Sequence, residues 1–372
     1  MTTAPIRVLL VEDSPVALTI LKRILATDPE IQVVGVAHNG IEALELIPQV
    51  QPTVICTDLH MPKMSGLELI RRIMSEFPRP VLVISASVQE EDRQNVFQLL
   101  QAGALEVFPK PRTGLSSEYE QNKQALINAI KVLAGVSVFT QRLRVVPPVA
   151  SSNGNPPVYS NSTRPTSTGS SVLSGGPVVD IRLPRVVAIG ASTGGPQALH
   201  TILRPLPATF PVPILCVQHI SEGFLQGLVT WLNAECALKI AIAQPGELPK
   251  PGTVYFAPER HHLQLDSQGR FTYLAAPPVA GHCPSATVLF QAVAAYYRRS
   301  AIGILLTGMG RDGADGLLSL AESGSSTIVQ DEASCVVFGM PKEAIALGAA
   351  QQILPLQDIA ALLPKIFHTS CQ

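Results

Sequence analysis

The sequence predicts an α/β protein that joins an N-terminal (βα)5 unit to a second, doubly wound unit built on a mainly parallel sheet. Short runs rich in Val and Ile alternate with amphipathic segments along most of the 372 residues, as expected for parallel strands covered by helices on both faces. Between about residues 141 and 184, a stretch rich in Ser, Pro, Gly, Asn and Thr interrupts this alternation, with too few apolar residues to form a core. At roughly 150 residues per domain, the length fits two or three domains. We therefore predict a first domain over residues 1–136, a flexible linker over 137–184 and a second domain over 185–372.

Composition and charge exclude several classes of protein. The chain carries 27 Lys and Arg against 28 Asp and Glu, and this net charge of -1 argues against nucleic acid or an anionic membrane as the main partner. Its six cysteines form no C-x-x-C pair, which favours reduced thiols in a cytoplasmic protein. The N-terminus lacks an apolar signal core, and no apolar run is long enough to span a bilayer. We therefore expect a cytoplasmic protein without direct membrane insertion.

The first domain contains five strand and helix pairs. The expected strands are residues 7–12, 32–37, 53–58, 80–85 and 105–108. The expected helices are residues 15–25, 40–47, 66–76, 90–101 and 119–133. Ligands of such sheets bind at the carboxyl ends of the strands, so the residues that end the strands are the candidate site.

Polar residues with complementary chemistry end these strands. Glu12 and Asp13 follow the first strand, Asp58 the third, Ser85 the fourth and Lys110 the fifth. Clustered carboxylates disfavour one another unless a cation lies among them, and oxygen ligands suit Mg²⁺. A carboxylate beside a metal, a lysine and a hydroxyl can accept a phosphoryl group. A single acid of this kind more often caps a helix, but five such groups in this order favour a magnesium and phosphoryl-acceptor site.

This arrangement resembles the receiver domain of two-component response regulators. The resemblance covers about residues 5–136 and rests on V-E-D-S at 11–14, D-L-H-M-P at 58–62, S-A at 85–86 and K-P at 110–111. It implies phosphorylation of Asp58 by a partner histidine kinase. It also implies Mg²⁺ bound by Glu12, Asp13, Asp58 and the backbone carbonyl of His60. Val107 stands where receivers usually carry an aromatic switch residue.

The second domain resumes the alternation. The expected strands are residues 185–190, 213–218, 253–257, 263–265, 301–307 and 326–330. The expected helices are residues 196–203, 224–233, 285–298, 314–322 and 342–347.

A G-x-S-x-G motif places Ser192 directly after the first strand of this domain and before a helix. Glycines permit a sharp strand-to-helix turn, and the helix N-terminus offers free N–H groups to a developing oxyanion. A plain glycine-rich connection with a helix cap is an equally simple interpretation of the motif alone. A dinucleotide cradle is disfavoured, because the next strand ends in Gln218-His219 and not in an acid.

His219 and Asp312 follow other strands of the same sheet, so both should lie on the edge that carries Ser192. The three form a candidate Ser-His-Asp triad in a chain order unlike that of α/β-hydrolases. Two rival sites are weaker. Cys216 could be a thiol nucleophile, but it lies inside a strand. The His and Cys residues at 261–262 and 282–283 do not have the spacing of a common zinc site.

Over both domains the chain resembles the chemotaxis response-regulator protein-glutamate methylesterases (CheB-like). The matching segments are residues 189–196, 217–219, 257–263, 305–316 and 330–344. The resemblance implies hydrolysis of glutamate γ-methyl esters on chemoreceptors, with deamidation of glutamine in some members, and no cofactor for ester hydrolysis. Ser192 would attack the ester, His219 would take its proton and Asp312 would orient His219. The backbone N–H of Met309 would hold the oxyanion, and Thr193 would contact His219.

Two departures from the family pattern stand near this site. Ile220-Ser221 replaces the frequent Met-Pro, and Cys283 replaces an arginine that would bind substrate.

Regulation and the alternatives follow from the two-domain organisation. A long linker gives the receiver a high effective concentration over the second domain, so we expect the unphosphorylated receiver to cover the approach to Ser192. Phosphorylation of Asp58 would weaken that docking, with Ser85 reaching toward the phosphate. The alternatives are the same esterase in a non-motility pathway, or a regulator whose second domain only binds a partner.

Overall fold

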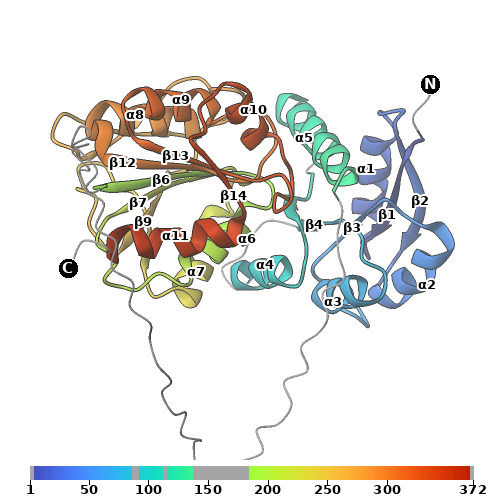
Figure 1. The fold of residues 1–372 in the computed structure, drawn as a ribbon. Helices are drawn as coiled ribbons and strands as arrows, with labels where there is room; N and C mark the ends of the chain where they lie inside the picture. Colours follow the sequence, from blue (N-terminus) through green and yellow to red (C-terminus); the bar gives the residue numbers. More distant parts are fainter. Residues whose placement is uncertain (1–3, 86–91, 112–115, 137–183, 369–372) are drawn as a thin grey trace, which may run out of the picture.

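The structure is a computed structural model that describes residues 4–85, 92–111, 116–136 and 184–368. Two α/β units lie side by side (Figure 1). Apart from residue 184, the predicted linker over 137–184 lies outside the described residues.

The first unit is a five-stranded parallel sheet in the order β2-β1-β3-β4-β5. Its strands are β1 (Ile6–Val11), β2 (Ile31–Ala37), β3 (Val54–Thr57), β4 (Val81–Ser85) and β5 (Glu106–Pro109). Its helices are α1 (Pro15–Leu25), α2 (Gly40–Val50), α3 (Gly66–Glu76), α4 (Asp92–Gln101) and α5 (Ser116–Ala134). The predicted (βα)5 unit is confirmed, with element ends that differ by a few residues.

Alternating side chains of β1 divide the core of this unit into two layers. Val8 and Leu10 pack with α1 and α5, whereas Leu9 and Val11 pack with α2, α3 and α4. This is the two-sided burial expected of a parallel strand.

The second unit is a seven-stranded parallel sheet in the order β14-β13-β12-β6-β7-β9-β8. Its strands are β6 (Val186–Ala191), β7 (Ile214–Gln218), β8 (Lys239–Ile242), β9 (Thr253–Phe256), β12 (Ala301–Leu305), β13 (Ser326–Gln330) and β14 (Gln352–Leu354). An antiparallel hairpin of β10 (His262–Leu265) and β11 (Phe271–Leu274) lies beside it.

Helices cover both faces of this sheet. They are α6 (Gly195–Leu203), α7 (Leu225–Glu235), α8 (Ala286–Tyr297), α9 (Ala314–Glu322), α10 (Met340–Ala346) and α11 (Leu356–His368), and a 3-10 turn follows α8 at Arg298–Ser300. Helices α6, α7 and α11 pack on one face, and α8, α9 and α10 pack on the other. The sequence reasoning missed β8, β11, β14 and α11.

The topology of this sheet positions the candidate site. The chain starts at β6, adds β7 on one side of it and later adds β12 on the other. Loops that leave the carboxyl ends of β6, β7 and β12 therefore meet at a topological switch point, where open α/β sheets bind their ligands.

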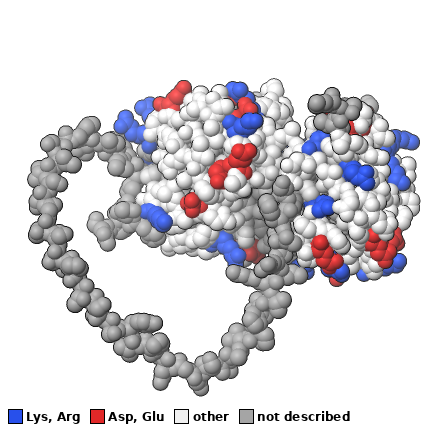
Figure 2. All heavy atoms as spheres, turned by 45° about the vertical axis from the view of Figure 1, so that its right-hand side comes forward, with Lys and Arg blue, Asp and Glu red and all other residues white. Residues whose placement is uncertain are grey.

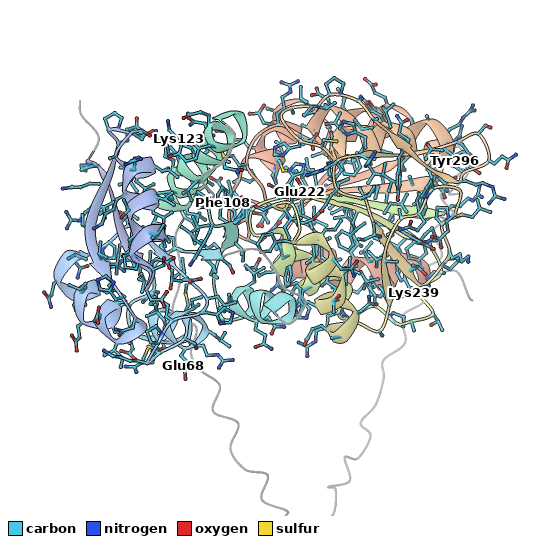
Figure 3. All side chains as sticks on the ribbon, turned by 180° about the vertical axis from the view of Figure 1, so that it is seen from behind. Glu68, Phe108, Lys123, Glu222, Lys239 and Tyr296 are labelled. Atoms are coloured by element: carbon cyan, nitrogen blue, oxygen red, sulfur yellow. The ribbon has the colours of Figure 1, made fainter. Side chains whose placement is uncertain are left out.

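The first unit packs on the second unit through α4, which lies against α7 and α6 (Figure 1). The ring of Phe97 stacks on that of Trp231, with centroids 5.5 Å apart. Nε2 of Gln197 donates to the carbonyl of Ala104 at 2.8 Å and to that of Leu100 at 3.4 Å. In the reverse view of Figure 3, side chains of both units fill the boundary between them.

The charge pattern agrees with the near-zero net charge. Acidic and basic side chains are interspersed on the face shown in Figure 2, so this face carries no broad basic surface. Among the described residues, no helix combines the length and apolar character that crossing a membrane would require.

Candidate functional site

The strand ends of the first unit bring Glu12, Asp13, Asp58 and Lys110 together. Nζ of Lys110 lies 2.6 Å from Oδ2 of Asp58 and 2.8 Å from Oε2 of Glu12. Burial, followed by the charge of Asp58, raises the pKa of Glu12 above its ordinary value. Burial opposes the charged form of Lys110, but its hydrogen bonds to Asp58 and Glu12 still raise the pKa of this lysine. The site is therefore a crowded, partly desolvated acid cluster with one cation beside it.

This cluster has the donor chemistry of a magnesium site. One carboxylate oxygen from each of Glu12, Asp13 and Asp58 lies within 4.8 Å of the others. Burial of Glu12 and the neighbouring charge of Asp58 disfavour its ionised form, and a hard divalent cation among the three carboxylates would favour it. Ser85 ends β4 beside Pro109 of β5, where its carbonyl accepts from the Lys110 N–H at 2.8 Å. The residues predicted for Mg²⁺ are thus brought together.

In the second unit, Ser192 follows β6 at the start of the turn into α6. Its N–H donates to the Thr307 carbonyl at 3.0 Å, and its carbonyl accepts from the Gly195 N–H at 2.7 Å. Gly194 adopts a φ of 77°, and a Cβ there would lie 2.6 Å from the Val336 side chain. The glycine is therefore required for the sharp turn that leaves Ser192 8% exposed at the sheet edge.

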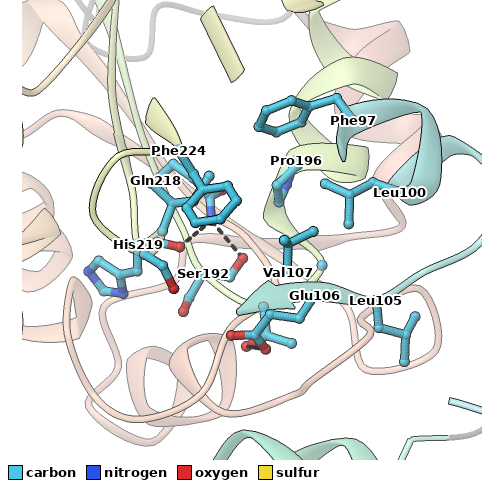
Figure 4. A pocket seen from close by; sticks show the side chains of 14 residues that line it. Phe97, Leu100, Leu105, Glu106, Val107, Ser192, Pro196, Gln218, His219 and Phe224 are labelled. Carbon is cyan, nitrogen blue, oxygen red and sulfur yellow. Dashed lines mark hydrogen bonds between the residues drawn. The ribbon is translucent and has the colours of Figure 1, made fainter. Parts of the chain in front are cut away.

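His219 follows β7 and bonds Asp312, as the sequence predicts. The two residues are joined through Nε2 and Oδ2 at 2.8 Å. The other ring nitrogen, Nδ1, is buried and has no hydrogen-bond partner among the described residues. With Nε2 donating to the carboxylate, Nδ1 is left as an acceptor beside the pocket that His219 lines together with Ser192 (Figure 4).

Asp312 is held by the start of α8. Its Oδ1 accepts from Oγ of Ser285 at 2.6 Å and from the Thr287 N–H at 3.1 Å, and its Oδ2 accepts from the Ala286 N–H at 2.7 Å. Burial alone would raise the pKa of Asp312, but the hydrogen bonds from His219, Ser285 and Ala286 hold it well below its usual range. Asp312 is therefore a fixed carboxylate that can orient an imidazole and stabilise its charged form.

His282 is a part of this site that sequence reasoning missed. Its ring lies parallel to that of His219, with centroids 3.7 Å apart. Burial and the neighbouring His219 lower the pKa of His282 to about 4, so its ring is neutral near pH 7. The same loop supplies Ser285, whose N–H donates to Nδ1 of the buried His262 at 3.2 Å. His282 and Ser285 lie three residues apart in one loop, and this spacing was the sequence signal that could have linked them.

Gln218 connects the two strand ends. Its Nε2 donates to the carbonyl of Ser192 at 2.8 Å and to that of His219 at 2.7 Å (Figure 4). This side chain fixes the spacing of the two loops, and sequence reasoning used Gln218 only as evidence against a dinucleotide site.

The two assisting residues lie close to Ser192. Gly308, directly before Met309, runs so close to Ser192 that a Cβ on it would lie 2.6 Å from that of Ser192. The backbone of Met309 therefore continues past the candidate nucleophile, while its side chain is 47% exposed. The hydroxyl of Thr193, predicted to contact His219, donates to Oε2 of Glu106 in the receiver at 3.2 Å.

The pocket at Ser192 has walls from both units. It measures about 390 Å³ including space open to solvent. The second unit contributes Ser192, Thr193, Gly194, Pro196, Gln218, His219, Ile220, Ser221 and Phe224, and the receiver contributes Phe97, Leu100, Leu105, Glu106 and Val107. Val107 thus faces the second unit at the position where receivers usually carry an aromatic residue.

The rival sites gain no support. Cys216 is fully buried, and burial raises the pKa of its thiol far above the ordinary value. His262 is engaged with Ser285 and with the Pro277 carbonyl, at 3.2 Å in each case. Within the described residues, the grouping with metal-ligand geometry is the receiver acid cluster.

A second pocket next to His219, about 560 Å³, includes Cys283. Arg260 lines it as well and forms an ion pair with Glu222. Arg260 therefore places an arginine in this pocket, although position 283, where the family pattern has an arginine, is Cys283.

Comparisons with known proteins agree with this architecture. The response regulator receiver domain model matches residues 8–115, and the CheB methylesterase model matches residues 187–363. A protein-glutamate methylesterase/protein-glutamine glutaminase of Nitrosospira multiformis is 41% identical over 97% of this chain and 97% of that protein. One from Myxococcus xanthus is 40% identical over 100% of this chain and 99% of its own length. A crystal structure of the Thermotoga maritima CheB methylesterase catalytic domain is 37% identical, with a TM-score of 0.48, and covers 49% of this chain and 98% of that one.

The chain is thus a response regulator whose receiver is joined to a hydrolase domain. It belongs to the protein-glutamate methylesterase/protein-glutamine glutaminase family. The predicted family, the predicted α/β fold and the predicted class of enzyme are confirmed.

Proposed function

We propose that this chain is a phosphorylation-controlled hydrolase that removes methyl esters from glutamate side chains of chemoreceptors and deamidates receptor glutamines during chemotaxis adaptation. The observation that carries the proposal is the 2.8 Å pair of His219 and Asp312 at the pocket that contains Ser192. The names of full-length relatives about 40% identical to it support the substrate class.

The first half of the reaction forms an acyl-enzyme. Oγ of Ser192 attacks the ester carbonyl while His219 takes its proton at Nδ1, the buried nitrogen left without a partner. Asp312 stabilises the imidazolium through Nε2. The backbone N–H of Met309 holds the oxyanion. When the C–O bond of the ester breaks, methanol leaves with the proton from His219.

The second half is hydrolysis. Water gives a proton to His219 and attacks the acyl carbon, after which Ser192 leaves as the hydroxyl and the receptor glutamate is released. A glutamine side chain follows the same course with ammonia as the leaving group.

The receiver would control this reaction. Asp58 accepts a phosphoryl group from a histidine kinase, and Lys110, 2.6 Å from Asp58, neutralises developing charge. Glu12, Asp13 and Asp58 would hold Mg²⁺, and the cation would supply positive charge for the phosphoryl oxygens. A cytoplasmic location stays a prediction.

Docking of the receiver on the second unit would regulate access to the Ser192 pocket. Because Leu105, Glu106 and Val107 form one wall of the Ser192 pocket, the docked receiver excludes a receptor helix from that pocket. Phosphorylation of Asp58 weakens the docking, with Ser85 drawn toward the phosphate. A coupling of about 1–3 kcal/mol between phosphorylation and activity is expected.

Methanol release from methylated receptor fractions tests the proposal. Ser192→Ala should lose turnover and unfold at nearly the wild-type temperature, since it removes a single hydroxyl at a turn. Ser267→Ala, at the exposed tip of the β10-β11 hairpin, is the matched control and should keep full turnover. Near wild-type turnover by Ser192→Ala would exclude this mechanism.

A further inference from the structure

Glu106 places a glutamate side chain of the receiver next to the candidate nucleophile. It is the first residue of β5, and its carboxylate Oε2 accepts from Oγ1 of Thr193, the residue after Ser192, at 3.2 Å. Glu106, Ser192 and His219 line one pocket (Figure 4). The group that the proposed reaction produces, a glutamate carboxyl, is therefore already present at the site.

The surroundings of this carboxyl suit an uncharged acyl group. Of the residues that line the pocket, Glu106 and His219 are the two with titratable side chains. The receiver wall is otherwise largely apolar, with Phe97, Leu105 and Val107. Burial raises the pKa of Glu106 to about 7, and the Thr193 hydrogen bond only partly offsets this. Near pH 7 a substantial fraction of the side chain is thus the neutral acid, whose charge and shape resemble those of a glutamyl ester without its methyl group.

We propose that Glu106 occupies the subsite for the substrate glutamyl side chain, so that the receiver inhibits the enzyme as a mimic of its product. This inference rests on the proposed function. It assigns the Thr193 hydroxyl and the apolar wall from Phe224 and Pro196 as the surface that recognises the substrate acyl group.

The contact between Glu106 and Thr193 can be removed without removing the other contacts between the two units. The Phe97 ring on Trp231 and the bonds from Gln197 to Leu100 and Ala104 hold the two units together outside this contact. Removal of the Glu106 carboxyl should therefore empty the subsite while the units stay docked.

The test uses the unphosphorylated full-length chain and a small substrate, the γ-methyl ester of a glutamate capped at both ends. Such an ester needs the subsite but lacks the receptor helix, whose bulk the docked receiver excludes. Glu106→Ala should release methanol about 5-fold faster than wild type or more, the lower bound of a typical allosteric coupling. Glu45→Ala, an exposed acid on α2, is the matched control and should match wild type.

A second measurement uses capped glutamate as the inhibitor. With the subsite emptied, this product analogue should inhibit Glu106→Ala competitively, raising KM without changing kcat, and should inhibit wild type far less. If Glu106→Ala behaves as wild type in both assays, the receiver covers the entrance without mimicking product and the inference is wrong. Ser192→Ala in the same assay separates the two proposals, because residual turnover there would instead overturn the mechanism.

Discussion

Nε2 of His219 and Oδ2 of Asp312 lie 2.8 Å apart, although 93 residues separate them in the chain. The sheet explains the encounter, since β7 and β12 flank β6 and their carboxyl ends open on the same edge. The start of α8 then fixes the carboxylate from its other side. The imidazole is thus oriented before substrate binds, so its orientation need not be established during the reaction.

Asp312→Asn should fold but lose most activity. The amide can still accept hydrogen bonds from α8, but it neither fixes the tautomer of His219 nor stabilises its charged form. A drop in kcat of about 10⁴-fold is expected, as in other Ser-His-Asp enzymes. Methanol release reports the loss, and circular dichroism checks the fold. Asp315→Asn, an exposed acid paired with Arg311, is the control, and an equal loss there would point to general destabilisation.

The receiver site should require both its acceptor and a divalent cation. Asp58→Asn removes the carboxylate that Lys110 contacts, so it should block labelling by acetyl phosphate almost completely. A chelator should do the same to wild type, because it removes the Mg²⁺ that Glu12, Asp13 and Asp58 would hold to neutralise charge on the phosphoryl oxygens. Glu45→Gln should label normally. Acid-labile label that persists on Asp58→Asn would place the phosphorylation site elsewhere.

The strand-end residues of the site could be predicted, and the supporting residues could not. Ser192 and His219 directly follow strands and Asp312 lies in the loop after another, so a parallel sheet predicts all three at one edge. His282 and Ser285 lie in an irregular loop whose path depends on tertiary packing, so strand patterns do not place them. Glu106 meets Thr193 across two units, and no local pattern encodes that contact. Among the elements, β14 has three residues, which is too short for a periodic pattern, and α11 contains Pro364, which argues against a helix when the sequence is considered alone.

His282 should make stability depend on pH. Burial, together with His219, lowers its pKa from 6.5 to about 4, so the unfolded chain binds more protons than the folded one between these values. The free energy of unfolding should fall as pH drops from about 6.5 to 4. Below about pH 4, His282 should cause no further loss. The contribution is of order 1–3 kcal/mol.

Urea unfolding at several pH values measures this effect. His282→Phe retains a ring on His219 but cannot titrate, so its stability should fall less steeply with acid. His38→Phe, a substitution outside the site, should retain the wild-type slope. An unchanged slope in His282→Phe would show that other groups carry the acid dependence.

Docking of the receiver should weaken as pH rises, because of Glu106. Its pKa is raised from 4.5 to about 7 in the docked arrangement, chiefly by burial. The contribution of Glu106 to the stability of the docked arrangement is therefore fully present below about pH 4.5, where the carboxyl is neutral in both arrangements. This contribution is lost as pH rises through about 7. Basal turnover should rise correspondingly. His219 lines the same pocket and takes part in the proposed reaction, so the pH profile of wild type alone cannot isolate the effect. Glu106→Gln removes the titration at position 106 and leaves the other residues of the pocket unchanged. The ratio of wild-type to Glu106→Gln basal turnover should then climb through neutral pH, and a flat ratio would show that ionisation of Glu106 does not oppose docking.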